Sequence, residues 1–246
     1  MKSLLYKIPT SGKPAMLELN VMAKDYAKFG VRGYDPTKPF TVYFSREIEI
    51  KKPQQVFSFS LPVSPLTNLV VELKPIIGEQ YQVRLQKKPL KKLSRKRFSF
   101  PKKLNGFIKH AIEFSTIAGF TPTGLYTNDQ DQYPIYLQEQ IIDAKGYPVD
   151  TPSRVNIETG EIIVKRDIFQ SLSIPIRVNI LLHEYMHHYH QTFDEAKADY
   201  HAQEIYLELG FPKYEAILAQ GKIFWDSPEM IRRLQQTQKN ILNYQE

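Results

Sequence analysis

The residues of this sequence with the clearest chemical meaning are five consecutive ones, His183-Glu184-Tyr185-Met186-His187. Side chains four apart on an α-helix lie on one face, so His183 and His187 can offer two imidazole nitrogens to one metal ion. Glu184 is rotated by about 100° on the same helix, which places its carboxylate beside such an ion. The pattern H-E-x-x-H therefore indicates a zinc site in which Glu184 takes a proton from an attacking water molecule.

Two further histidines, His188 and His190, fall off the face that His183 and His187 share. We interpret His188 and His190 as ordinary polar residues at the C-terminal end of the helix, where a positive charge complements the helix dipole. His183 and His187 could also be ordinary polar residues of the helix, but the carboxylates that follow in the sequence favour a metal site.

A catalytic zinc ion usually takes three protein ligands and leaves one position for water. Candidates for the third ligand lie at the start of a second helix, which we expect to run from Asp194 to Leu209 and to stop at Gly210. Glu195 and Asp199 are four apart and lie in line with the apolar stripe of this helix. Carboxylates that face a core need a partner, and a metal site would provide one.

A short turn at residues 190–193 would fold the second helix back antiparallel to the first. Glu195 would then lie near His187, and Asp199 would lie near His183. The sequence therefore predicts that His183, His187 and Glu195 converge as metal ligands, with Asp199 as an acid that contacts a ligating histidine.

Two alternatives concern the same carboxylates. Thr192 and Glu195 have the spacing of a capping box, in which Thr192 caps the second helix and Glu195 reaches back to it. That motif explains Glu195 but not Asp199, so we favour the metal interpretation. In the other alternative, Asp199 is the third ligand and Glu195 belongs to the cap.

The combined pattern resembles that of a known family. His183-Glu184-x-x-His187 followed by Glu195-x-x-x-Asp199 is similar to the HExxH and ExxxD motifs of the gluzincin branch of the zincin metallopeptidases. The resemblance implies that His183, His187 and Glu195 bind zinc, that Glu184 is the general base, and that Asp199 hydrogen-bonds a ligating histidine.

The resemblance covers about residues 150–210 and departs from the family in one respect. Seven residues separate His187 from Glu195, which is considerably fewer than in thermolysin-like members. The metzincin pattern is absent, because no glycine and third histidine follow His187 at the required positions.

The surrounding sequence predicts the elements that must position these residues. A zincin-type site needs an edge strand beside the active helix, and residues 154–165 read as two short strands about a turn at Thr159-Gly160. Ser173 and Pro175 suit the start of the active helix. The other expected elements are a strand at 133–142, a turn at Gly146, and helices at 104–115, at 212–220 and from Ser227, the last with apolar positions at Ile231, Leu234, Ile241 and Leu242.

This order of elements predicts an α+β chain with two cores. We expect a zincin-like metallopeptidase domain of helices and a small sheet at residues 104–246. Aromatic-rich, alternating runs at 41–50 and 56–61, broken by prolines, predict a β-rich binding or assembly module at residues 1–86. Residues 87–103 would form a basic linker between them.

The net charge of +7 is unevenly distributed along the chain. Residues 80–112 contain eleven Lys or Arg and no acid, so the remainder carries a net charge of −4. Such a run could contact phosphates of a nucleic acid. We favour a solvated linker, because a single basic run does not define a nucleic-acid-binding fold.

The sequence contains no cysteine, so any metal must be bound by histidine and carboxylate side chains. The first ten residues lack the apolar run of a secretory signal peptide, and no segment approaches the eighteen apolar residues of a membrane span. We therefore expect a cytoplasmic or virion-associated protein with no membrane partner.

The leading hypothesis is a zinc-dependent peptidase that acts on a protein or peptide, with Glu184 as general base. The rival hypothesis is a structural or assembly protein that retains a zincin fold and joins a larger assembly through residues 1–103. The whole arrangement, rather than any single motif, is similar to that of HExxH proteins of phages, so the rival includes a component of a phage virion.

Overall fold

The computed structural model describes residues 2–90, 100–223 and 228–244 and contains both helices and strands, as expected for an α+β chain. These residues divide into two compact units. The first unit comprises residues 2–90 and 210–212, and the second comprises 100–209, 213–223 and 228–244. Within the described residues, no helix combines the length and the apolar character needed to cross a membrane.

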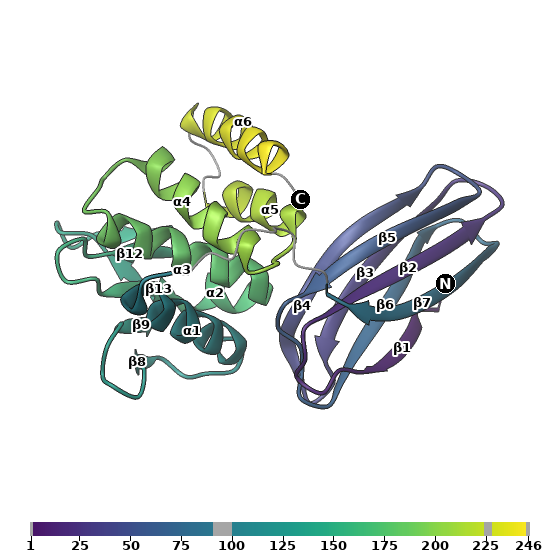
Figure 1. The fold of residues 1–246 in the computed structure, drawn as a ribbon, viewed down its shortest axis with the longest axis horizontal. Helices are drawn as coiled ribbons and strands as arrows, with labels where there is room; N and C mark the ends of the chain where they lie inside the picture. Colours follow the sequence, from purple (N-terminus) through teal and green to yellow (C-terminus); the bar gives the residue numbers. More distant parts are fainter. Residues whose placement is uncertain (1, 91–99, 224–227, 245–246) are drawn as a thin grey trace. The chain divides into compact units, whose positions relative to one another are not determined.

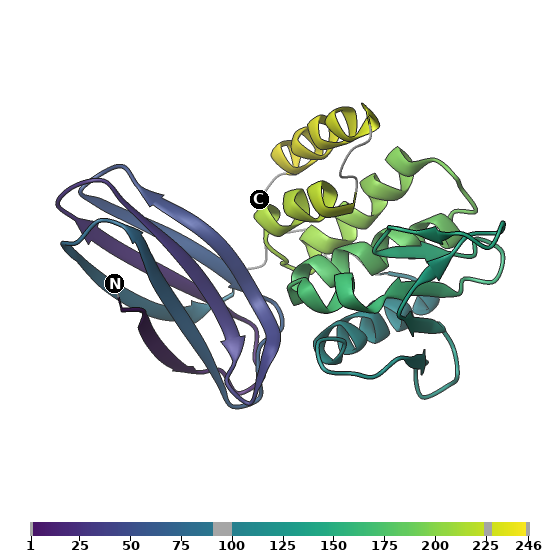
Figure 2. The same ribbon diagram turned by 180° about the vertical axis from the view of Figure 1, so that it is seen from behind.

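The first unit is a sandwich of two antiparallel sheets, whose strands run side by side in both views of the fold (Figures 1 and 2). One sheet has the strand order β1-β6-β3-β4 and the other has the order β5-β2-β7. Phe29 of one sheet contacts Tyr81 of the other, with ring centroids 4.8 Å apart. The strands are β1 (Leu4–Pro9), β2 (Ala15–Ala23), β3 (Ala27–Asp35), β4 (Lys38–Ile50), β5 (Gln54–Leu61), β6 (Asn68–Ile77) and β7 (Tyr81–Pro89).

Alternating side chains explain this sandwich. In β2 the buried residues recur at every second position, because successive side chains of a strand point to opposite faces of the sheet. The runs expected at 41–50 and 56–61 lie in β4 and β5. The expected boundaries of the basic linker were wrong at both ends, since β7 continues to Pro89 and the first helix begins at Lys102. Residues 91–99 of that linker lie outside the described residues.

The second unit combines a small mixed sheet with six helices among its described residues (Figure 1). The sheet has the order β12-β13-β9-β8, in which only the β13 and β9 pair is parallel, so β12 lies at an edge. The strands are β8 (Gly124–Tyr126), β9 (Ile135–Gln138), β10 (Ile141–Ile142), β11 (Pro148–Val149), β12 (Ser153–Val155) and β13 (Ile162–Lys165). The helices are α1 (Lys102–Ile117), α2 (Arg166–Ser171), α3 (Ile174–Tyr189), α4 (Glu195–Glu208), α5 (Lys213–Ile223) and α6 (Pro228–Asn243).

Helix α3 is the centre of this unit. Ser173 occupies its N-cap position and Pro175 lies in its first turn, where a missing backbone N–H costs nothing. Every residue from Ile174 to His187 is buried, because α3 packs against α1, α4, α5 and β12. Phe107 of α1 stacks on Tyr185 of α3 with ring centroids 3.7 Å apart. Helix α3 is thus buried on more than one side.

The expected strand at 133–142 is interrupted. Its first part forms β9 in the main sheet, whereas Ile141 and Ile142 leave that sheet and pair with β11 in a separate hairpin. The expected turn of this hairpin is present at Gly146, whose φ of 87° suits a residue without a Cβ atom.

Candidate metal centre

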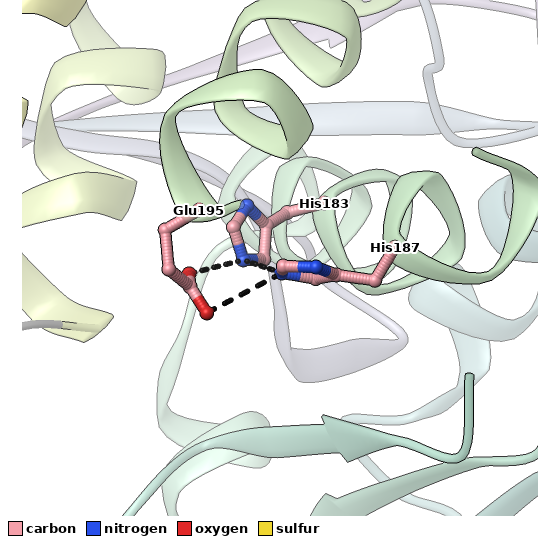
Figure 3. Close-up of side chains that lie close together, drawn as sticks. All are labelled: His183, His187 and Glu195. Carbon is pink, nitrogen blue, oxygen red and sulfur yellow. Dashed lines mark hydrogen bonds and ion pairs between the residues drawn. The ribbon is translucent and has the colours of Figure 1, made fainter. Parts of the chain in front are cut away.

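The candidate metal centre lies where α3 and α4 meet. Residues 190–194 form a tight turn between the two helices, with Gln191 at a φ of 48° and the backbone N–H of Thr192 donating to the carbonyl of His187. This turn brings the first residue of α4, Glu195, beside the last two turns of α3. The side chains of His183, His187 and Glu195 point toward one another (Figure 3).

The N-terminus of α4 is capped by Asp194. Its carboxylate accepts hydrogen bonds from the backbone N–H groups of Ala196 and Lys197 at 2.9 and 3.1 Å. The Thr192 hydroxyl instead accepts from the backbone N–H of Asp194. The capping box of Thr192 and Glu195 is therefore not formed, and the Glu195 carboxylate is turned to the histidines.

The three side chains have the spacing of ligands around one ion. The Nε2 atoms of His183 and His187 are 3.1 Å apart, and the Glu195 oxygens lie 3.2 Å from Nε2 of His183 and 3.5 Å from Nε2 of His187. Ligands about 2.0–2.1 Å from a tetrahedral metal ion are about 3.4 Å from each other. The ligand atoms therefore surround a space that fits a metal ion of this size.

In each imidazole ring, the hydrogen bond made by Nδ1 determines whether Nε2 carries a proton or a lone pair. Nδ1 of His183 lies 2.8 Å from the Asp199 carboxylate, and Nδ1 of His187 lies 2.8 Å from the carbonyl oxygen of Thr192. Both neighbours only accept hydrogen bonds, so the proton of each neutral ring belongs on Nδ1. The two Nε2 lone pairs and the Glu195 carboxylate then face one another, and this arrangement of acceptors needs a cation between them.

The pKa values of His183 and Glu195 in the metal-free protein reflect the closeness of the imidazoles to the carboxylates. Burial lowers the pKa of His183, but its contacts with Asp199 and Glu195 outweigh burial and raise that pKa to about 10. Burial also opposes ionisation of Glu195, yet the two histidines and Arg233 hold the pKa of its carboxyl well below the usual range. In the metal-free protein, a proton therefore takes the position of the cation.

Asp199 and Arg233 contact the candidate ligands His183 and Glu195 and each other. Asp199 is buried on α4, where its carboxylate contacts His183. The same carboxylate accepts two hydrogen bonds of 2.8 Å, one from Nε of Arg233 and one from the side-chain amide of Gln220. The Arg233 guanidinium, which comes from α6, also lies 3.0 Å from Oε2 of Glu195. Asp199 thus lies beside His183, the neighbour that the sequence predicted for it, while Arg233 is a supporting residue that the sequence did not reveal.

Glu184 lies beside the centre, on the floor of a cleft with a volume of about 580 Å³. The hydroxyl of Ser153 donates a 2.7 Å hydrogen bond to Oε1 of Glu184, and both side chains are buried. Ser153 belongs to the edge strand β12, so the strand both lines the cleft and fixes the carboxylate. No sequence motif indicated this role of Ser153.

The walls of the cleft come from three segments. Strand β12 with the loop that follows it, the end of the β10–β11 hairpin and the turn between α3 and α4 all contribute lining residues, among them Val149, Arg154, Val155, Ile157 and Phe193. Because β12 pairs only with β13 within the described residues, its other edge is available to an extended chain in the cleft.

Several other histidines and tyrosines of α3 and α4, and the residue that follows α3, do not line the cleft. His188 lies 2.7 Å from the carbonyl oxygen of Ile157 through Nδ1, and His190 stacks on His201 with ring centroids 4.2 Å apart. Tyr200 contacts Glu204, and Tyr206 is fully buried. None of these side chains lines the cleft, so none is placed to contact a substrate there.

The comparisons with known proteins find no relative. No protein-family model matches this chain, and no curated protein or solved structure is significantly similar to it.

Proposed function

We propose that this protein is a zinc-dependent peptidase whose centre is formed by His183, His187 and Glu195. The observation that supports it best is the convergence of two imidazole lone pairs and one carboxylate at metal-ligand spacing, beside a second carboxylate in an open cleft. The similarity of the motifs to those of gluzincins, and the order of strands and helices around them, support a zincin-like fold for the second unit.

Zinc is the proposed ion because the donors are two imidazoles and a carboxylate, a set that catalytic zinc sites use with a fourth position open to water. When bound, zinc would supply Lewis acidity that polarises the scissile carbonyl and acidifies a neighbouring water molecule. The exposed side of the ligand cluster faces the cleft, which leaves room for both groups.

In this proposal Glu184 is the general base. Its carboxylate takes the proton of the attacking water and passes it to the leaving amine. Ser153 keeps the carboxylate oriented, and Asp199 keeps His183 in the tautomer that presents Nε2 to the metal. The free edge of β12 aligns the substrate as an additional extended strand.

The decisive experiment replaces Glu184 with glutamine. The Glu184→Gln variant should bind about one zinc ion per chain, like the wild type, because Glu184 is not a ligand. It should fail to cleave peptides that the wild type cleaves. The measurements are elemental analysis and mass spectrometry of a peptide library after incubation.

A His183→Ala variant is the matched control, since it should lose both the metal and the activity. Peptide cleavage by the Glu184→Gln variant at the wild-type rate would contradict the role of Glu184 as general base. Absence of metal in the wild type, even after incubation with zinc, would sink the metal centre itself.

A role in assembly is the second candidate function. The observation that favours it is the first unit, which contributes nothing to the metal centre and exposes several large apolar side chains, namely Leu5, Phe40, Val56 and Leu66. Size-exclusion chromatography with light scattering tests this candidate. A monomer that cleaves peptides and co-purifies with no other protein would remove its support.

A further inference from the structure

Arg154 occupies the middle of the edge strand β12. Its neighbour Ser153 faces α3, where it contacts Glu184. Successive side chains of a strand point to opposite faces, so Arg154 belongs to the other face of the sheet. There it lies opposite Ile163 of β13, which in turn lies opposite Tyr136 of β9.

A second pocket lies on that face of the sheet. It has a volume of about 490 Å³, and strand β10 of the β10–β11 hairpin forms part of its wall. Its lining residues include Tyr136, Ile141, Ile142, Asn156 and Ile163. Arg154 and Val155 line both this pocket and the metal cleft. The two cavities therefore adjoin along β12.

The carboxylates that line the cleft have partners in the structure, whereas the side chain of Arg154 has none among the described residues. Arg154 is the only Lys or Arg that lines the metal cleft in the described part of the chain. Each cleft carboxylate already has partners: Glu184 accepts from Ser153, Glu195 contacts the histidines, and Asp143 accepts from backbone N–H groups.

The second pocket has one carboxylate, that of Glu161. This carboxylate accepts hydrogen bonds from the hydroxyls of Thr159 and Tyr136. Within residues 100–223 and 228–244, the side chain of Arg154 makes no hydrogen bond and no ion pair, whereas the side chain of Arg166 in the same unit pairs with Glu139 at 2.6 Å. Arg154 thus presents an unused guanidinium at the boundary between the two cavities.

We propose that Arg154 binds a carboxylate of the substrate, so that the cleft selects peptides with an acidic group next to the residue at the metal. This inference rests on the proposed function for the position of the peptide along β12. A peptide paired with that edge directs alternate side chains to α3 and to the second pocket. A guanidinium binds a carboxylate through two parallel hydrogen bonds, which suits either an Asp or Glu side chain or a C-terminal carboxylate.

The test measures binding by the full-length, zinc-loaded Glu184→Gln variant. The probes are fluorescein-labelled heptapeptide pools with Asp, Asn or Lys fixed at the central position, each made with a free and an amidated C-terminus. Fluorescence anisotropy should show about tenfold tighter binding of a pool with the recognised carboxylate than of its matched amide pool. Tighter binding of the Asp pool among the amidated peptides would show that Arg154 binds an acidic side chain of the peptide. Tighter binding of peptides with a free C-terminus would show that it binds the C-terminal carboxylate.

The Arg154→Glu change in the same background should abolish this preference and shift it toward the Lys pool. Lys109→Glu makes the same change of charge at an exposed residue of α1 and should keep the original preference. Arg154→Gln, which keeps a polar side chain, provides the same test if the charge reversal prevents folding. Equal binding of all pools before mutation, or an unchanged preference after it, would overturn the proposal.

Cleavage of the same pools by the chain that retains Glu184 separates this inference from the proposed function. Cleavage without any preference for a carboxylate would overturn the role of Arg154 alone. Binding that prefers a carboxylate, without cleavage, would overturn the peptidase alone.

Discussion

At the scale of single residues, the candidate metal centre is defined by the positions of the protons on its two imidazole rings. Asp199 and the carbonyl of Thr192 each accept from an Nδ1 atom, which leaves the Nε2 atoms of His183 and His187 facing Glu195. Without a metal ion, a proton on His183 neutralises this arrangement. If zinc binds as proposed, it would compete with this proton for the same position, and the competition would depend on pH.

The pH dependence of stability follows from these shifts. The pKa of His183 rises from 6.5 to about 10, so its stabilising effect is complete below pH 6.5 and is lost as the pH rises through 10. The pKa of Glu195 is lowered from 4.5, so its effect is lost in acid. Metal-free protein should therefore be most stable between about pH 4.5 and 6.5, and its thermal unfolding midpoint should fall from pH 7 to 10.

Zinc should reverse the trend above neutral pH, because it binds neutral imidazoles and its stabilising effect grows as they lose protons. A metal-free His183→Gln variant serves as the control and should show a weaker dependence between pH 7 and 10. A metal-free midpoint that rises across this range would contradict the assignment of the proton.

The sequence was sufficient for the part of the site that depends on local spacing. His183 and His187 are one helical turn apart, and Glu195 follows a turn too short to place it elsewhere. Ser153 and Arg233 were not foreseen, because their partners Glu184 and Asp199 lie 31 and 34 residues away in the chain. Such contacts depend on how β12 and α6 pack, which no local pattern fixes.

At the scale of elements, α6 shows how a local pattern can mislead. Its apolar residues Ile231 and Leu242 are exposed, whereas Arg233, Thr237 and Ile241 are buried. The buried stripe is largely polar because α4 presents polar partners to it, including Asp199 and Gln203, the latter donating to Thr237 at 2.8 Å. Helix positions could be read from periodicity, but the face that packs could not.

Arg233 should therefore tune the metal centre. Arg233→Met keeps much of the side-chain volume but leaves Asp199 and Glu195 without their cation, so zinc affinity should fall about 10–100-fold. Competition with a chromogenic chelator measures this affinity.

The exposed neighbour on the same helix provides the control, since Arg232→Met removes a charge without touching the centre. Equal zinc affinities for the two variants would show that α6 has no influence on the ligands.

The loop between β12 and β13 is held against α3 by a close contact. Gly160 has a φ of 78°, and a Cβ atom there would lie 2.9 Å from the His188 ring. Gly160→Ala should destabilise the second unit by about 2–3 kcal/mol through strain and this clash.

Gly146→Ala isolates the strain alone, since Gly146 has a φ of 87° with open space around it, and should cost only about 1 kcal/mol. Urea unfolding of both variants gives the comparison. Equal losses of stability would mean that the His188 ring moves away freely.

At the scale of the whole molecule, every residue of the candidate centre belongs to the second unit. The ligands, Glu184, Ser153 and Arg233 all lie between residues 153 and 233. A fragment of residues 100–246 should therefore bind one zinc ion with the affinity of the full chain, and a fragment of residues 1–90 should bind none. Elemental analysis and chelator competition measure both. A fragment 100–246 that folds but binds no zinc would show that the centre needs the first unit.

The tight turn between α3 and α4 also bears on the order of events during synthesis. The three ligands lie within a stretch of thirteen residues, so bringing them together closes only a small loop and loses little chain entropy. In the proposed zinc protein, a nascent chain would be able to bind the ion as soon as this helical hairpin has formed. Arg233 is made 34 residues after Asp199, so the ion would first be held loosely and then secured when the last helix docks.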